Sequence, residues 1–175
     1  MENFIIRPCI GIGNLELGMT REQIHELLGS QCHTEIKDGI MCDYYLNMLI
    51  QICYDDNLSV NFIEISCSTE CNVFYKETDI FKTKAEDLIQ YLNKEAEYLN
   101  TCEARNGYGY IYEDLGLSLY RSQVMNEKTM KEQWFLELSQ EQKEDELRFL
   151  NFEAVAVWSK GYYDTVKDLL LHNQG

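Results

Sequence analysis

The amino-acid sequence predicts an α+β fold made of two tandem units, each a helix followed by an antiparallel sheet, with both helices packed on one sheet face. Two observations support this prediction. A helical signature at residues 17–29 returns in weaker form at residues 83–93, and aromatic-rich, strand-like runs follow both copies. We therefore expect a single domain, with unit one spanning about residues 1–70 and unit two about residues 71–175.

The composition favours one packed domain over two tethered ones. Hydrophobic residues make up 45% of the 175 residues and aromatic residues 12%, far from the composition of a disordered chain. The chain holds one proline and no Ser/Gly-rich tract, so no linker stands out between the two units.

The first unit begins with a short strand and a capped helix. The strand at residues 4–6 is expected at a sheet edge or in an irregular arm, because Pro8 cannot donate a backbone hydrogen bond. Thr20 is the predicted N-cap of the helix, and Gln23 completes a capping box. Gly29 can then close the helix in the left-handed conformation.

Three strand-like runs follow this helix, at residues 40–46, 48–54 and 59–65. The sequence Asp55-Asp56-Asn57 predicts a hairpin turn between the last two runs. His25 lies on the helix beside two glutamates, so we expect a histidine that faces solvent rather than a metal ligand or a general base.

The second unit repeats this order with an insertion. Thr83 is the predicted helix cap, and strands are expected within residues 107–120 and 152–158. Between them, residues 124–150 are rich in helix-forming residues and predict one or two helices. A short terminal helix is expected at residues 165–172.

Acidic side chains outnumber basic ones by thirty to fifteen, which gives a net charge of −15. Such a field repels nucleic acid and anionic membranes and speeds encounter with basic proteins. The alternative is that the acidity only keeps the protein soluble. The N-terminal apolar run is too short for a signal peptide, and no run of ~18 apolar residues is present, so we expect a cytoplasmic protein without membrane contact.

Seven cysteines are present without a CxxC pair or regular spacing, which does not fit an oxidised secreted scaffold. We expect most of these thiols to be small buried apolar residues in a reducing cytoplasm. Cys67 and Cys71 form the closest pair, but the three histidines do not complete a zinc-ligand spacing around them. The sequence therefore predicts neither a metal nor a cofactor.

No catalytic motif is present, neither a GxSxG elbow, nor an HExxH helix, nor a phosphate loop. Three early glycines match a dinucleotide-binding loop only in part, because Glu16 occupies the position of the third glycine of that motif. Five carboxylates on or beside predicted strands are expected to face solvent, with a magnesium site as the alternative. They are Asp43, Glu64, Glu113, Asp114 and Glu153.

Tyrosines and acidic residues on the exposed sheet face are the candidate contacts for a partner protein, because tyrosine gives a large contact area at little entropic cost. An acidic cluster in the insertion is added to them. The candidates are Tyr44, Glu64, Tyr110, Tyr112, Glu113, Glu141, Glu144, Asp145, Glu146 and Tyr162. The alternative is that the rings fill a core and that the acidic cluster is a solvated helix face.

The run from Gly11 to Gly29, with its Leu17-Gly18-Met19-Thr20 segment, resembles the opening of the β-lactamase-inhibitor-protein-like fold. In that fold a helix with this signature leads into an antiparallel sheet, and the inhibitor itself is a tandem of two such units. The resemblance covers residues 11–29, extends loosely over the strands to residue 65, and reaches the second copy only by pattern. A small acidic protein of this architecture is also similar to bacterial immunity proteins, which neutralise toxin domains, often basic nucleases.

The resemblance and the charge together lead us to expect a non-enzymatic inhibitor that binds a basic toxin domain. Two alternatives stay open. One is a metal- or thiol-dependent enzyme that uses strand carboxylates or Cys67 and Cys71, and the other is a cytosolic scaffold module. The sequence leaves the oligomeric state undetermined.

Overall fold

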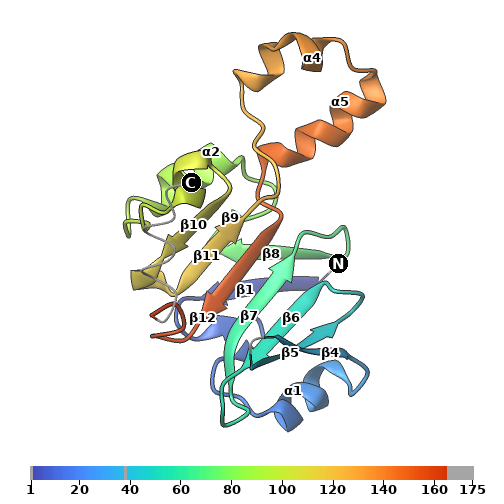
Figure 1. The fold of residues 1–175 in the computed structure, drawn as a ribbon. Helices are drawn as coiled ribbons and strands as arrows, with labels where there is room; N and C mark the ends of the chain where they lie inside the picture. The colour runs from blue at the N-terminus through green and yellow to red at the C-terminus, as the bar shows by residue number, and fades with distance from the viewer. Residues whose placement is uncertain (1, 38, 165–175) are drawn as a thin grey trace.

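A computed structural model describes residues 2–37 and 39–164, and in these residues the protein forms two mostly antiparallel sheets and five α-helices (Figure 1). The α+β prediction is confirmed at this level. The terminal helix predicted at residues 165–172 lies outside the described residues. No described helix has the length and apolarity that crossing a membrane requires.

The larger sheet has seven strands in the order β10-β11-β12-β7-β6-β5-β4. All neighbouring strands in it are antiparallel. The bounds, in that order, are Gly109–Tyr112, Leu117–Tyr120, Ala154–Trp158, Val60–Ser66, Ile50–Tyr54, Ile40–Tyr45 and His33–Lys37. At the centre β7 pairs with β12, so that Ile65 lies opposite Val155 and Ile63 opposite Val157. The three strands predicted first, β5 to β7, therefore form as expected, with small shifts at their ends.

The smaller sheet has five strands in the order β3-β2-β1-β8-β9. Their bounds, in that order, are Leu15–Glu16, Gly11–Ile12, Glu2–Arg7, Cys71–Tyr75 and Thr78–Asp79. The expectation of an edge position for the first strand is wrong, because β1 lies between β2 and β8 and pairs with β8 in parallel. Pro8 follows the last residue of β1, so its missing N–H group lies outside the ladder.

The predicted capping box of α1 (Arg21–Leu28) is present. The Thr20 hydroxyl accepts from the backbone N–H of Gln23, and the Gln23 side chain accepts from the backbone N–H of Thr20. Gly29 has a φ of 87° but a ψ of 163°, so it ends the helix without the left-handed helical conformation. The cap predicted for the second helix is wrong, because α2 (Ala85–Leu92) begins after Lys84 and the Thr83 hydroxyl donates to the backbone carbonyl of Asp79.

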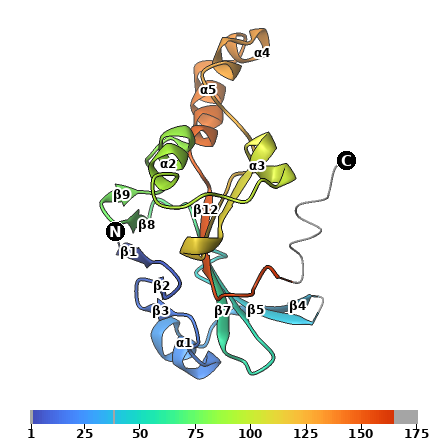
Figure 2. The same cartoon turned by 90° about the vertical axis from the view of Figure 1, so that its left-hand side faces the viewer.

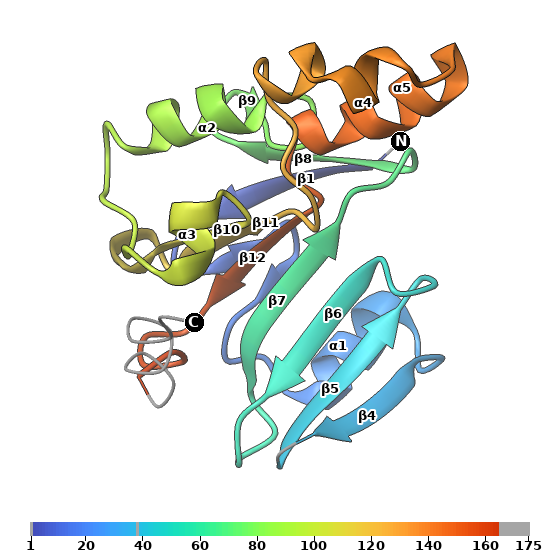
Figure 3. The same ribbon diagram turned by 45° about the horizontal axis from the view of Figure 1, so that its top comes forward.

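The main core lies between the two sheets and the helices α1 and α2. Ile24 of α1, Leu88 of α2, Val73 of β8, and Ile63 and Val155 of the larger sheet are all buried in one cluster. Figure 2 shows α1, α2 and the smaller sheet on the same side of the larger sheet, and Figure 3 shows α1 behind β5 and β6. The opposite face of the larger sheet points away from α1, α2 and the smaller sheet, and we call it the open face.

The insertion forms an arm at one end of the molecule (Figure 1). It contains η2 (Thr129–Lys131), α4 (Gln133–Leu136), α5 (Gln140–Leu147) and η3 (Arg148–Leu150), as the prediction of one or two helices required. A small apolar cluster of its own, centred on Met125, Phe135 and Phe149, holds it together.

Buried Arg121 ties this arm to the body of the protein. Its side chain is 3% exposed, and it donates to the backbone carbonyls of Gly107 at 2.8 Å and Phe149 at 3.1 Å. Its guanidinium also lies 5.6 Å from the ring centroid of Phe152. Two segments far apart in the sequence are therefore held by one side chain.

Several elements formed where the sequence predicted only connections. Strand β4, the strand pair β8 and β9, and α3 (Cys102–Asn106) all lie in such segments. Every residue of β4 is exposed, so the segment carries no alternating apolar pattern that would have indicated a strand.

The cysteines differ from the expectation that most are small, buried, free thiols. Cys42 and Cys53 stand directly opposite each other on β5 and β6 and form a disulfide. Among the free thiols only Cys71 is buried, whereas Cys9 and Cys67 are exposed.

Gly11 allows two strands to approach closely. This steric requirement explains why a glycine occupies the position that first suggested a nucleotide loop. A Cβ atom there would lie 2.0 Å from the backbone carbonyl oxygen of Leu15 in the paired strand β3. We therefore expect Gly11→Ala to lower the free energy of unfolding by roughly 2–3 kcal/mol. Gly18→Ala is the control, because its Cβ meets no atom within 4 Å and only the positive φ of 84° opposes it. Chemical denaturation compares the two, and equal losses would contradict the steric explanation.

Candidate functional site

Asp43 is the most strongly hydrogen-bonded carboxylate in the described chain, and it joins α1 to the larger sheet. It lies on β5 with no exposed surface. Arg21, the first residue of α1, donates from Nε to Oδ2 at 2.7 Å and from Nη2 to Oδ1 at 2.8 Å. Thr34 on β4 donates to Oδ1 at 2.6 Å, and Tyr54 on β6 donates to Oδ2 at 3.0 Å. Three elements, α1, β4 and β6, therefore converge on one carboxylate of β5.

This environment keeps Asp43 ionised. Burial raises the pKa of Asp43, but the hydrogen bonds from Arg21, Thr34 and Tyr54 outweigh burial and bring the pKa below its ordinary value of 3.8. The same pair raises the pKa of Arg21, chiefly through the hydrogen bond to Asp43. The phenol of Tyr54 stays protonated because burial and the nearby carboxylate both raise its pKa.

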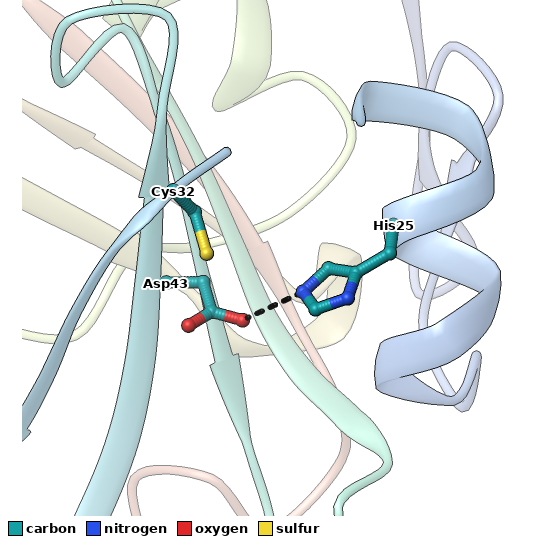
Figure 4. Close-up of side chains that lie close together, drawn as sticks. All are labelled: His25, Cys32 and Asp43. Atoms are coloured by element: carbon teal, nitrogen blue, oxygen red, sulfur yellow. Dashed lines mark ion pairs between the residues drawn. The ribbon is translucent and has the colours of Figure 1, made fainter. Parts of the chain in front are cut away.

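His25 and Cys32 complete a cluster with metal-ligating atoms around Asp43 (Figure 4). The His25 Nε2 atom lies 3.8 Å from Asp43 Oδ2, and the ligand atoms of all three residues lie within 4.8 Å of one another. The expectation of a solvent-facing His25 is correct only in part. Its side chain is 29% exposed, but its ring is turned toward the sheet and its Nε2 atom is buried without a hydrogen bond. The expectation that Asp43 faces solvent is wrong, because its side chain is fully buried.

The cluster does not fit a metal ion as it stands. A carboxylate offers about four lone-pair positions, and four donors from Arg21, Thr34 and Tyr54 occupy those of Asp43. A cation that entered would also meet the fixed positive charge of Arg21. We therefore interpret this cluster as a structural anchor for α1.

The open face of the larger sheet has a different character, because aromatic side chains gather on it. Strand alternation places Phe62 and Trp158 opposite to the main core, and they form a second buried cluster with Ile111 and Ala156. Tyr162 stacks on Phe62 with ring centroids 4.9 Å apart, and Tyr163 meets Trp158 edge-on at the same distance. Burial raises the pKa of Tyr162 to about 12.

The chain after β12 supplies these two tyrosines. Residues 159–164 turn back over the open face, where Figure 2 shows the red end of the described chain on the side away from α1 and α2. Tyr162 also lines a cavity of about 380 Å³ together with Tyr44, Glu35 and Lys37. Part of the open face is thus covered, and part remains a polar and aromatic surface.

Glu64 stands in the middle of this face, between Phe62 and Ser66 on β7. It faces outward as predicted, yet its surroundings desolvate it, and this burial raises its pKa. Gln51, directly opposite on β6, turns its amide toward the sulfur of Cys53 rather than toward Glu64. Within residues 2–37 and 39–164 no hydrogen bond or ion pair reaches the Glu64 carboxylate.

The predicted contact residues lie in four places. Tyr44, Glu64 and Tyr162 lie on the open face. Glu141, Glu144, Asp145 and Glu146 lie on α5 of the arm, and Glu113 begins the short helix η1 (Glu113–Leu115). Tyr110 and Tyr112 are a correction, because they point into the main core and are 8% and 0% exposed.

The predicted contact residues left out Phe62, Trp158 and Tyr163. Phe62 and Trp158 are buried in the aromatic cluster of the open face, and Tyr163 packs against it. For Phe62 and Trp158 a signal existed, since each alternates along its strand with residues of the main core. Two exposed apolar residues at the tip of the arm were missed as well, Trp134 at 42% and Leu136 at 60% exposure.

No protein-family model, no curated protein and no solved structure matches this chain.

Proposed function

We propose that the protein is a non-enzymatic inhibitor that binds a basic protein domain through the open face of the larger sheet, with the arm as a second contact. A bacterial toxin domain, with nucleases as the first candidates, is the proposed partner. One observation carries the proposal: the half-buried tyrosines Tyr44, Tyr162 and Tyr163 lie near the unpaired carboxylate of Glu64 on the open face, in a protein with a net charge of −15. Such a surface combines the aromatic anchors and the field that capture of a cationic protein requires.

The sheet order supports the proposed tandem architecture. Strand β7 closes the first run of strands, β12 closes the second, and the two lie side by side. Each run follows a helix whose apolar residues enter the main core, Ile24 from α1 and Leu88 from α2. We propose that two like units join edge to edge in this way, as in the fold that residues 11–29 resemble.

An enzymatic role has less support. The one described group of three metal-ligating residues, His25, Cys32 and Asp43, is built around a carboxylate whose lone pairs are occupied. Cys67 and Cys71, the pair named for thiol chemistry, differ in environment, since Cys67 is exposed and Cys71 is buried. Although Cys67 keeps exposed surface, the protein atoms around its thiol partly desolvate it, and this desolvation and the charge of Glu153 raise its pKa, which disfavours the nucleophilic thiolate.

The proposal is tested with the protein encoded by the neighbouring gene. We expect the two purified proteins to form a stoichiometric complex in calorimetry, and we expect this complex to lack the toxic activity of the partner. Growth of cells that express the toxin domain should be restored by co-expression of the inhibitor. A complex that leaves the partner's activity unchanged would instead support a scaffold module.

Charge reversal on α5 should slow this association. We expect the triple variant Glu141→Lys, Glu144→Lys and Glu146→Lys to lower the association rate constant roughly tenfold at low salt, because electrostatic steering sets that rate. The dissociation rate should change little. Stopped-flow measurements over a range of salt concentrations give both constants.

The matched control places the same change in charge elsewhere on the surface. Glu26→Lys, Asp56→Lys and Glu77→Lys alter exposed residues of the body. If this control slows association as much as the α5 variant does, the total charge matters and the arm is not a contact.

A further inference from the structure

A cavity of about 550 Å³ opens where the arm leaves the larger sheet. Its volume lies within the range of roughly 300–1,000 Å³ that is usual for ligand sites. Its walls come from β7, β11, β12 and the chain at the base of the arm, which Figure 1 shows meeting at this end of the sheet. The cavity continues the open face, because Glu64 belongs to both.

Two small residues of the sheet, Ser66 and Ala154, line this cavity next to the larger Tyr120. Ser66, Ala154 and Tyr120 lie in one row across β7, β12 and β11, as the strand registers place them directly opposite one another. The neighbouring row holds Glu64 and Ala156. Short side chains therefore leave a depression in the sheet surface. Tyr120, which is 47% exposed, lines one side of this depression.

Two glutamates, Glu64 and Glu153, line the cavity, and neither forms an ion pair with another described residue. Glu153 uses one oxygen, Oε2, to accept from the backbone N–H and the hydroxyl of Ser122, both at 2.6 Å. This fixes its direction and leaves Oε1 without a hydrogen bond among the described residues. Glu64 has no such partner in the described chain.

One cationic side chain, Arg148, also lines the cavity. Its guanidinium lies 4.5 Å from the ring centroid of Phe149, and within residues 2–37 and 39–164 it forms no ion pair with either glutamate. The cavity therefore keeps an excess of negative charge beside an exposed aromatic ring. A planar guanidinium satisfies both features, since it binds carboxylates through two donors and stacks on aromatic faces with little hydration to lose.

We propose that this cavity receives an arginine side chain of the bound protein, with Glu64 and Glu153 accepting hydrogen bonds from its guanidinium and Tyr120 packing against its plane. The identity of the ligand as a protein side chain rests on the proposed function. Binding of a guanidinium in the cavity does not rest on it, so a small probe can test it separately.

The first experiment titrates the purified protein with N-acetyl-arginine methylamide and follows backbone amide signals by NMR. We expect saturable shifts at Ser66, Ala154 and Ala156. The citrulline analogue has the same shape without the charge, and it should not bind. Equal shifts with both probes, or shifts spread over the whole acidic surface, would overturn the proposal.

Glu64→Gln is expected to weaken probe binding roughly tenfold, the loss typical of one charge-assisted hydrogen bond. Glu70→Gln is the matched control, since it removes one exposed charge outside the cavity and should change affinity less than twofold. The Glu64 variant should also be at least as resistant to thermal unfolding at pH 7 as the original protein, because the substitution removes a desolvated and unpaired charge. Weaker binding with equal or higher stability excludes a folding defect. Unchanged affinity would overturn the assignment.

Arg148→Ala decides whether the protein fills its own cavity. If a partner's arginine is the ligand, probe affinity should change less than about threefold, the small effect of a rim charge. A much larger gain would show that Arg148 occupies the site and would overturn the proposal.

The partner complex then separates this inference from the proposed function. Inhibition of the toxin domain with an unchanged affinity of the Glu64→Gln variant would leave the inhibitor function in place and remove the arginine site. Binding of the probe without formation of any toxin complex would leave the arginine site in place and remove the inhibitor function.

Discussion

Replacing Asp43 with asparagine is expected to lower the free energy of unfolding by about 3–5 kcal/mol, the usual loss when one member of a buried ion pair is removed. The substitution keeps the shape of the side chain but leaves Arg21 without its counter-charge. It also turns an amide group toward donors that need an acceptor, namely Arg21, Thr34 or Tyr54. Urea denaturation at neutral pH measures the loss.

The pH dependence gives this prediction a second readout. The pKa of Asp43 in the folded protein is below its ordinary value of 3.8, so its stabilising effect is complete above that value and disappears as the pH falls through the folded-state pKa. The difference in stability between the original protein and Asp43→Asn should therefore be constant above about pH 5 and shrink below about pH 4.

Two further variants test the origin of this effect. Asp114→Asn makes the same chemical change at an exposed position and should alter stability by less than about 0.5 kcal/mol. Arg21→Ala should cost about as much as Asp43→Asn, and the double variant much less than the sum, because the two residues form one unit. Additive losses would contradict the anchor interpretation. Tight zinc binding by the unaltered protein would contradict it as well.

Arg121→Met is expected to lower stability by roughly 3 kcal/mol and to release the arm. Methionine keeps an apolar chain near the ring of Phe152 but leaves the backbone carbonyls of Gly107 and Phe149 without their donor. Each unsatisfied buried carbonyl costs about 1–3 kcal/mol. Hydrogen exchange should therefore become faster across residues 124–150 than in the sheets.

Arg148→Ala is the control for this experiment because its side chain is exposed at the surface of the arm. It should leave the exchange pattern nearly unchanged. If Arg121→Met instead speeds exchange evenly over the whole protein, the arm and the body unfold as one unit and Arg121 is not a local tie.

The sequence predicted local features that a few neighbouring residues determine. The capping box of Thr20 and Gln23 is one, since both partners lie within a single turn. Strands β5 to β7 are another, because each carries a run of apolar residues that indicates a buried strand. The class of the fold and the helical nature of the insertion follow from such local patterns.

Features that depend on distant partners could not be read in the same way. Asp43 occupies a strand position that a solvent-facing carboxylate would also take, and only Arg21 and Thr34, brought in by other elements, explain its burial. Tyr110 and Tyr112 looked like exposed rings, yet their side of the strand faces the core that α2 and the smaller sheet complete. To predict which face of a strand is buried, one must know which other elements cover that face.

The same distance between partners has a consequence for synthesis on the ribosome. Strand β7 leaves the ribosome long before β12. Ser66 of β7 therefore stays unpaired until Ala154 of β12 has been synthesised. At the usual rate of about 5–20 residues per second, the delay is several seconds. During that time the edge of β7 is bare, so a nascent chain depends on rapid completion, or on a chaperone, to avoid pairing with a neighbouring polypeptide.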